Sequence, residues 1–432
     1  MSLRLNALLL AVLSTLLGIL GEWSGTPVLR HLWALPAGLL LLGLALEGIL
    51  LTRCTVRLTL HGPERWAVLR RQPVTFAFSQ EGRRTLSVEV ALTVPEQFAA
   101  QPRIERLTLQ RPLESRLRLE AAPRRLGHYS WPAPPMRIGG LLGLAWWSRV
   151  VETSLAITVV PDLVGRFEQQ RAEQAGGATL NRVRGAGAEV LQLREYQASD
   201  PMRAIDWKAS ARRGRLISRE LSEDQHLEIV VAIDAGRASG LGAGETDRLS
   251  LYATITARLA QRATELDDAV GLLIFAAQPL VMLAPARGDR AVARINELLT
   301  ACRVQPSESN PIVAAARIRS TVQRRSLVVL LTDLEDFSAG EQLARAVRVL
   351  TPKHLPFIAT PSSDRIASLP SARVREALGA YRALAALEYT DALEGNVRAL
   401  RALGAAAVMA RPEELHRAVL EAYQGFRDRR RI

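Results

Sequence analysis

Two long apolar runs open the chain, over residues 5–21 and 32–51, and Glu47 is the one charged residue within them. Each run has the length of a helix that crosses a bilayer. A signal peptide would account for one such run but not for two, and no small-x-small cleavage site closely follows the first. The pattern therefore predicts a transmembrane helical hairpin over residues 1–52.

The charges beside these runs indicate how the hairpin is oriented. Arg4 precedes the first run, and Arg53 and Arg57 follow the second. Basic flanks favour the cytoplasmic side, so we expect a multi-pass protein of the cell inner membrane whose soluble domains are cytoplasmic. Glu47 lies near the end of its run, and we expect it to reach outward to the interface.

From residue 53 to 162 the pattern changes to short runs in which every second residue is apolar. This period indicates strands with one buried face, and their spacing predicts an antiparallel, β-sandwich-like middle domain. The Pro- and Gly-rich stretch over residues 124–147 is expected to be irregular. We expect Trp131, Trp146 and Trp147 to pack in a core or between domains.

Residues 163–225 form a polar connector followed by a densely charged segment that begins at Arg194. Residues 226–432 then alternate continuous apolar strands with amphipathic helices. That alternation predicts an α/β doubly wound, mainly parallel sheet covered on both faces. Asp234 and Asp333 each end a predicted strand, and sites on such sheets lie beyond the carboxyl ends of the strands.

Composition and motifs exclude several classes of function. The formal net charge is +13, which leaves a nucleic-acid-binding protein as an alternative, although no helix-turn-helix, zinc or stacking motif accompanies it. Neither Lys208 nor Lys353 stands in a Gly-Lys-Ser/Thr context, so the chain is no P-loop ATPase. Residues 240–244, GLGAG, lack the final glycine of a dinucleotide fingerprint. We expect no catalytic residues and no small-molecule substrate.

Asp234 and Asp333 allow one enzymatic alternative, a metal-dependent enzyme. Carboxylates at the ends of neighbouring strands can hold a hard divalent cation such as Mg²⁺. Each can equally cap the helix that follows it. A metal titration distinguishes the two.

The charged segment resembles the signature of the DUF58 family, in which Arg-Glu-Tyr precedes an Asp-x-x-Arg-x-Ile-Asp-Trp-Lys-x-Ser-Ala-Arg element and a later Arg-Glu. The matching positions here are Arg194, Glu195, Tyr196, Asp200, Arg203, Ile205, Asp206, Trp207, Lys208, Ser210, Ala211, Arg212, Arg219 and Glu220.

The resemblance implies that the α/β region is a von Willebrand factor A-like domain, with VVAIDAGRAS and VVLLTDLED as its two acidic strand ends. Such domains bind a cation through Asp-x-Ser-x-Ser, a threonine and a second aspartate. Here Asp234 and Asp333 are kept, but Gly236 and Ala238 replace the two serines, and the threonine position falls near Ser309 and Asn310. We therefore expect a degenerate metal site and no cofactor.

The charged segment is the predicted partner-binding site. We expect Tyr196, Ile205 and Trp207 to fasten it to the sheet, and charges such as Asp200 and Arg203 to pair with each other. The surface so formed would suit a protein partner. The predicted partner-binding residues are Arg194, Glu195, Tyr196, Asp200, Arg203, Asp206, Trp207, Lys208 and Arg212.

Taken together, these patterns favour a membrane-anchored, non-catalytic adaptor or scaffold. DUF58 proteins are commonly encoded beside MoxR-type AAA+ ATPases, so the resemblance implies such an ATPase as the partner. The chain has no ATPase motif of its own, and the partner would have to supply the energy. The remaining alternatives are the metal-dependent enzyme and the nucleic-acid-binding protein, and salt-dependent DNA binding would be the sign of the latter.

Overall fold

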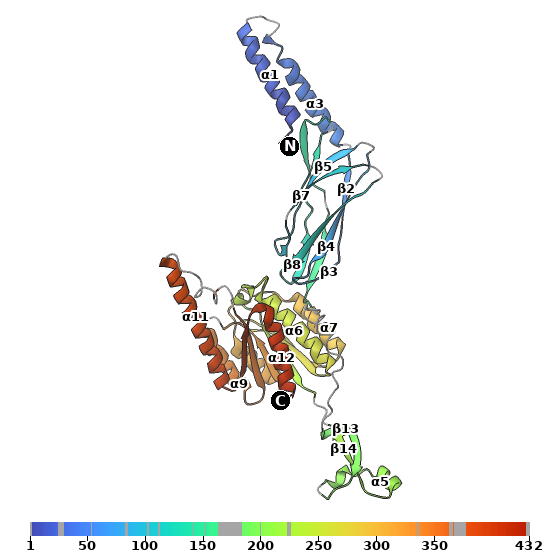
Figure 1. Ribbon diagram of the computed structural model, residues 1–432, viewed down its shortest axis with the longest axis vertical. Coiled ribbons are helices and arrows are strands. Elements are labelled where there is room, and N and C mark those ends of the chain that lie inside the picture. The colour runs from blue at the N-terminus through green and yellow to red at the C-terminus, as the bar shows by residue number, and fades with distance from the viewer. Residues whose placement is uncertain are drawn as a thin grey trace. The chain divides into compact units, whose positions relative to one another are not determined.

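The chain forms two compact units in a computed structural model (Figure 1). The first unit comprises Met1–Asp162 with Glu245–Ser250 and Leu299–Arg303, and the second holds the rest. The part of the predicted polar connector within residues 163–183 lies outside the described residues. The structure describes residues 2–24, 30–52, 54–82, 85–101, 103–110, 113–140, 142–151, 153–162, 184–198, 200–222, 226–334, 337–362, 366 and 377–428.

Two apolar helices begin the first unit, as predicted. Helix α1 spans Leu5–Ser24 and helix α3 spans Ala34–Thr52, and they lie side by side in Figure 1. Both are long and apolar enough to cross a membrane, and most of their side chains are exposed in the chain itself. A core helix of a soluble protein would bury this surface, so the two helices suggest a membrane anchor.

A strand-rich region follows the two helices, and it includes a short strand that precedes α1. Strand β1, Ser2–Leu3, belongs to a sheet of order β1-β11-β10-β5-β7; two further sheets run β2-β4-β8-β6 and β3-β12-β9. Among the described residues of these sheets, paired strands run antiparallel, except that β12 runs parallel to β3. The strands are β2 Val56–His61, β3 Arg65–Ala67, β4 Gln72–Gln80, β5 Leu86–Leu92, β6 Phe98–Ala99, β7 Arg103–Leu109, β8 Ser115–Pro123, β9 Gly127–Trp131, β10 Met136–Gly139, β11 Ala145–Arg149 and β12 Leu155–Val160.

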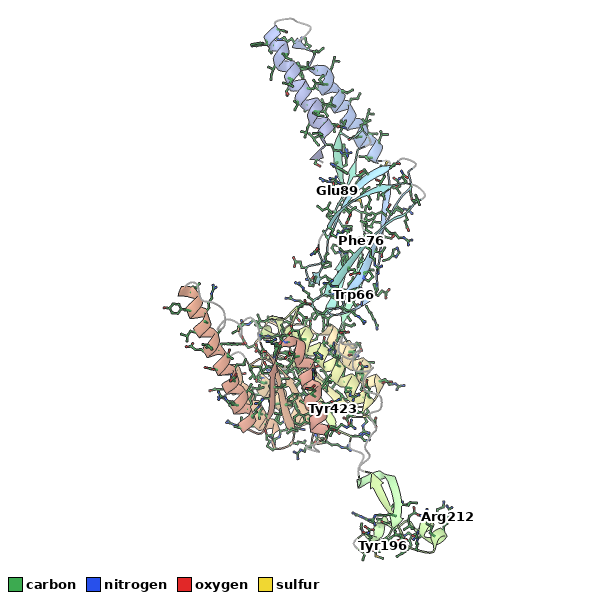
Figure 2. The ribbon with its side chains drawn as sticks, in the orientation of Figure 1. Trp66, Phe76, Glu89, Tyr196, Arg212 and Tyr423 are labelled. Carbon is green, nitrogen blue, oxygen red and sulfur yellow. The ribbon has the colours of Figure 1, made fainter. Side chains whose placement is uncertain are left out.

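An aromatic cluster fills the core of this region. Trp66 and Trp131 are fully buried with ring centroids 6.2 Å apart, and Phe98 meets both edge-on at 5.5 Å. Phe76 of β4 adds a fourth ring (Figure 2). The prediction that Trp131 packs in a core is confirmed. The prediction that residues 124–147 are irregular is wrong for half of that stretch, which β9, β10 and the start of β11 occupy.

Glu47 is buried, and the prediction that it reaches outward is wrong. It has no exposed surface. Its carboxylate accepts hydrogen bonds from the backbone N–H groups of Leu142, Leu144 and Ala145, at 2.8, 3.0 and 3.1 Å. The turn between β10 and β11 therefore supplies the solvation that water would otherwise give this carboxylate.

The second unit contains a six-stranded sheet of order β19-β18-β15-β20-β21-β22, parallel except for β19. This confirms the predicted alternation of strands and helices. The strands are β15 Glu228–Asp234, β18 Ala269–Phe275, β19 Pro279–Ala286, β20 Leu327–Leu331, β21 Leu355–Pro361 and β22 Ala406–Ala410; the longer helices are α6 Arg248–Glu265, α7 Asp289–Ala301, α8 Pro311–Thr321, α9 Phe337–Leu350, α11 Ala377–Ala402 and α12 Pro412–Asp428.

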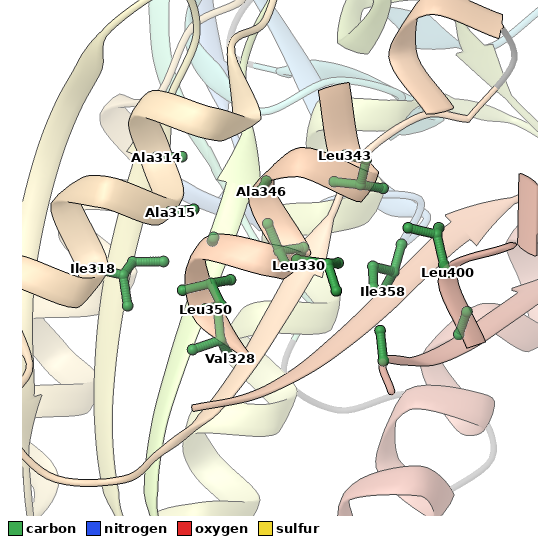
Figure 3. Packing of buried hydrophobic residues seen from close by; sticks show 14 of the residues in the cluster. Ala314, Ala315, Ile318, Val328, Leu330, Leu343, Ala346, Leu350, Ile358 and Leu400 are labelled. Atoms are coloured by element: carbon green, nitrogen blue, oxygen red, sulfur yellow. The ribbon is translucent and has the colours of Figure 1, made fainter. Parts of the chain in front are cut away.

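Alternate residues of the central strands face opposite sides of the sheet, so each strand is apolar throughout. Val230, Val328 and Ile358 belong to a buried cluster with residues of α8, α9 and α11 (Figure 3). On the other face Phe357 packs against Phe426 of α12 with ring centroids 5.6 Å apart. Helices thus cover both faces of the sheet, as predicted.

A buried polar contact ties the last helix to the sheet. Asp268, just before β18, is fully buried and accepts hydrogen bonds from the Tyr423 hydroxyl of α12 and from the backbone N–H of Leu227, the latter at 2.9 Å. Figure 2 labels Tyr423 in this unit. Burial raises the pKa of Asp268 and of Tyr423 above their usual values. The contact fixes α12 at the start of two central strands.

His416 gives the second unit a testable dependence on pH. Its burial in α12, with the Arg258 guanidinium adding to the effect, lowers the pKa of His416 to about 4. An unfolded histidine has a pKa of about 6.5. As pH falls from about 6.5 towards 4, the unfolded state therefore binds a proton that the folded state does not, and stability falls.

We expect His416→Gln to flatten this loss of stability. Thermal melts of the full-length protein in detergent, taken between about pH 4 and pH 8, should show a smaller fall in Tm for the variant than for the wild type. His128→Gln serves as the control for removing a histidine. Parallel curves for wild type and His416→Gln would show that His416 does not contribute to the acid sensitivity.

Candidate functional site

In the sheet of the second unit, the direction in which successive strands are added reverses between β15 and β20. The chain enters at β15, adds β18 and β19 on one side, and then places β20, β21 and β22 on the other. In such sheets the crevice beyond the carboxyl ends of the two central strands is where ligands bind. Asp234 ends β15, and Thr332 and Asp333 directly follow β20. The predicted pair of carboxylates therefore lies at this switch point.

Polar groups of the chain itself surround the Asp234 carboxylate. Oδ1 accepts from the backbone N–H of Gly236 at 2.8 Å and from the Ser309 hydroxyl, and Oδ2 accepts from the Thr332 hydroxyl at 2.7 Å. Asp234 is almost fully buried, whereas Asp333 is partly exposed. Three donors stabilise the negative charge of Asp234 without an ion.

A side chain at Gly236 would meet the side chain of Ser309. A Cβ atom at Gly236 would lie 2.1 Å from the Ser309 hydroxyl oxygen. The side chain of Ser309 therefore fills the space that a hydroxyl ligand on residue 236 would need. Ala238 has no polar side-chain atom, and Arg237 next to it forms an ion pair with Glu308. Among the described residues, no three His, Cys, Asp or Glu side chains gather as a metal site would require.

The charged signature segment forms a small structure of its own, which we call the signature arm (residues 184–222). Strand β13, Arg184–Glu195, pairs antiparallel with β14, Ile217–Ser222. Between them lie a 3-10 turn, η1, Met202–Ala204, and a short helix, α5, Trp207–Arg213. Every predicted partner-binding residue lies in this arm.

One group of signature residues points inward and holds the arm together. Asp200 pairs with Arg194 at 2.5 Å and accepts the backbone N–H of Gln197 at 3.0 Å. The Tyr196 hydroxyl donates to the backbone carbonyl of Asp200 at 3.2 Å. On the surface of the arm, the exposed Glu195 pairs with Arg215. The predicted pairing of Asp200 with Arg203 is wrong, because Arg194 on the adjacent strand is its partner.

The same inward group builds helix α5. Asp206 caps the helix by accepting the N–H of Ala209 at 2.9 Å. The buried Ser210 hydroxyl donates to the Asp206 carbonyl at 2.7 Å and accepts the Ile217 N–H at 2.8 Å. Gly214 ends the helix with a positive φ of 67°, which glycine adopts without strain. Asp206 therefore caps a helix.

A second group of signature residues is exposed. Trp207 is 65% exposed and Met202 is 71% exposed. Arg203, Lys208 and Arg212 are exposed as well (Figure 2 labels Arg212). We call these five residues the arm surface. That Trp207 fastens the segment to the sheet stays a prediction; among the arm residues whose burial the structure describes, the buried apolar side chains are Ile205 and Ile217.

Burial limits the reactivity of Cys302. Cys54 and Cys302 are free. Cys302 is buried, and burial raises the pKa of its thiol to about 11. A thiol must be deprotonated to act as a nucleophile or a metal ligand, so Cys302 is poorly suited to either role at neutral pH.

Sequence reasoning missed two features. One is the burial of Glu47, whose partners lie almost a hundred residues away in the chain. The other is the first half of α11, which presents an exposed stripe of apolar side chains at every third position. These are Leu378, Tyr381, Leu384 and Leu387. Their spacing of three was a readable signal, but that part of the helix was not predicted.

Comparison with known proteins supports the resemblance seen in the sequence. A family described as "Protein of unknown function DUF58" matches residues 192–373, which take in most of the signature arm and much of the α/β sheet. No curated protein matches the chain.

Several solved structures align with parts of the chain. A conserved hypothetical protein BatB from Bacteroides thetaiotaomicron is 13% identical over 46% of this chain and 98% of its own, with a TM-score of 0.30. The CARDB domain of the PF1109 protein from Pyrococcus furiosus is 12% identical over 24% of this chain and 93% of its own, with a TM-score of 0.18. A beta-glucosidase from Listeria innocua is 11% identical over 25% of this chain and 16% of its own, with a TM-score of 0.14. Scores this low carry no argument about fold or function.

A double-mutant cycle tests the packing at the switch point. Gly236→Ala should destabilise the protein, because its methyl group displaces the Ser309 hydroxyl from Asp234. Ser309→Ala should also destabilise it by removing that hydrogen bond. Combined, the two changes should cost less than their sum by about 0.5–3 kcal/mol, the usual range for residues in contact.

Chemical denaturation of the four proteins measures this coupling. Arg237→Ala, which removes one side of an exposed ion pair, is the matched control and should change stability by at most about 1 kcal/mol. Strictly additive losses for Gly236→Ala and Ser309→Ala would show that the two residues do not compete for one space.

Proposed function

We propose that the chain is a membrane-anchored, non-catalytic adaptor that docks a protein partner through the arm surface. Helices α1 and α3 anchor it in the cell inner membrane. The α/β unit, which we take to be von Willebrand factor A-like, works without a cation. The observation that carries the proposal is the exposure of Trp207 and Met202 among three basic side chains on a well-braced arm.

The chemistry of the arm surface supports a protein partner. Tryptophan and arginine are the residues that most often dominate the energetics of protein interfaces, whereas an exposed tryptophan contributes little to the stability of a free chain. The basic residues beside it complement an acidic partner and speed its association. The inward polar residues of the arm have hydrogen-bond partners already, so they serve as the scaffold.

A MoxR-type AAA+ ATPase is the partner that the family resemblance suggests. The chain's own sequence has no P-loop, so the energy for any remodelling would come from that partner. The degenerate site at Asp234 fits this role. Its carboxylate is satisfied by Ser309, Thr332 and Gly236, so docking in this proposal depends on the arm surface and on no bound cation.

Substitutions on the arm surface test the docking role. Trp207→Ala should leave the melting temperature nearly unchanged, because an exposed residue rarely alters stability by more than about 0.5 kcal/mol. It should weaken partner capture by about 2 kcal/mol or more, as loss of a central aromatic does. Lys208→Ala and Arg212→Ala should weaken capture less, and wild-type capture should fall with rising salt. The measurement is a pull-down of the MoxR-type ATPase by the full-length protein in detergent.

Two controls sharpen this test. Arg294→Ala removes an exposed arginine from α7, outside the arm, and should bind like the wild type. Asp206→Ser keeps a helix-capping oxygen, whereas Asp206→Ala removes it at a cost of about 0.5–2 kcal/mol. If Asp206 acts as a cap, Asp206→Ser should still bind. Undiminished capture by Trp207→Ala would contradict docking through the arm surface.

The proposed topology is tested separately. Because the basic flanks of the hairpin favour the cytoplasm, a tag at the C-terminus should resist protease in intact spheroplasts and be cut only after lysis. Two control proteins give the reference points. A periplasmic protein should be cut in intact spheroplasts, and a soluble cytoplasmic protein should be cut only after lysis. Digestion of the tag in intact spheroplasts would reverse the orientation.

A further inference from the structure

Strand β11 and the turn before it lie along the second apolar helix. A Cβ atom on Gly43 would lie 2.5 Å from the Leu144 side chain, and one on Gly48 would lie 3.1 Å from the Trp147 ring. The Arg149 guanidinium donates to the carbonyl of Leu51 at 2.8 Å. Arg149 therefore lies beside the last turn of α3, whereas Leu144 lies beside the middle of the helix.

The β10–β11 turn thus lies well inside the length of α3. Gly43 is nine residues before the last residue of the helix, Thr52, which corresponds to about 14 Å. A bilayer that ended at the level of Gly43 would leave only residues 34–43 of α3, about 15 Å, to cross a hydrocarbon core of about 30 Å. Helix α1 begins next to the same turn, since the Arg4 N–H donates to the carbonyl of Leu144 at 2.8 Å.

The described N–H groups of this turn have hydrogen-bond acceptors within the protein. Leu142, Leu144 and Ala145 donate their N–H groups to Glu47. Gly140 donates to the carbonyl of Ala145 at 2.8 Å, and Gly143 donates to that of Gly140 at 3.0 Å. Irregular backbone survives at membrane depth only when its polar groups are satisfied within the protein. All the N–H groups of the described residues 140 and 142–145 meet that condition.

The side chains around the turn match a membrane interface. Leu142, at the tip of the turn, is 53% exposed. Leu46 and Ile49, which lie between Gly43 and the end of α3, are exposed as well. The Trp146 ring has the Arg4 guanidinium 4.6 Å from its centroid. Aromatic and basic residues gather in this way at the level of lipid headgroups. An apolar tip flanked by such residues favours lipid as its neighbour.

We propose that the β10–β11 turn, described at residues 140 and 142–144, enters the bilayer on the hydrocarbon side of the headgroups, with Leu142 towards the acyl chains. It is a third membrane contact beside α1 and α3, and Glu47 is the group that satisfies its backbone there. This inference rests on the proposed membrane anchoring by the hairpin.

Site-specific labelling of the full-length protein in lipid vesicles tests the inference. The parent protein carries Cys54→Ala and keeps the buried Cys302. The parent without an added cysteine is treated in the same way, to measure any labelling of Cys302. Single cysteines at Leu142, Val150 and Ile19 are each labelled with an environment-sensitive fluorophore. Val150 is 87% exposed and follows the other end of β11, and Ile19 is 67% exposed on α1. Quenching by a lipid carrying a shallow nitroxide is compared with quenching by aqueous iodide.

We expect the label at Leu142 to be quenched several-fold more by the nitroxide lipid than the label at Val150, and less by iodide. The label at Ile19 should be quenched by lipid as well, which reports insertion of the hairpin. If Ile19 is lipid-quenched while Leu142 behaves like Val150, the turn lies in water and the inference is wrong. If Ile19 is also open to iodide, the hairpin is not inserted, and the membrane anchoring fails together with the inference.

Discussion

A carboxylate on an apolar helix must be either solvated by water or fully hydrogen-bonded by the protein. Glu47 is hydrogen-bonded by the protein. Its buried oxygens collect three backbone N–H groups from the β10–β11 turn. Removing such a charge from water is costly unless donors replace the lost hydration. The geometry that satisfies Glu47 also fixes where the hairpin meets the strand-rich region. The placement of β1, α1 and α3 on that region depends on this contact.

The same constraint organises the other polar groups of the chain. At the switch point of the α/β sheet, Ser309 and Thr332 satisfy Asp234 directly. In the signature arm, Arg194 satisfies Asp200, and Asp206 caps α5. Each of these carboxylates has hydrogen-bond or ion-pair partners within the chain, and these contacts stabilise the local structure. In the proposed docking role, recognition is left to the exposed residues of the arm, which combine an aromatic ring with positive charge.

Much of the fold followed from sequence periodicity. The two apolar runs and the alternation of strands and helices in the second half predicted elements that the structure contains. Local chemistry could also have shown that Asp206 caps a helix, because an aspartate stands directly before the Trp207–Arg213 segment. The orientation of Trp207 could not be read, since a seven-residue helix is too short to show a periodic buried face. The burial of Glu47 could not be read either, because its partners come from a distant turn.

Hydrogen–deuterium exchange of residues 139–147, measured on the full-length protein in lipid vesicles, tests the role of Glu47 most directly. The account predicts slow exchange there in the wild type. In Glu47→Ala, exchange should be faster by about tenfold or more, as expected when a charged hydrogen-bond acceptor is lost, while peptides from β4 and from the α/β sheet keep their rates. Unchanged slow exchange of residues 139–147 in Glu47→Ala would contradict it.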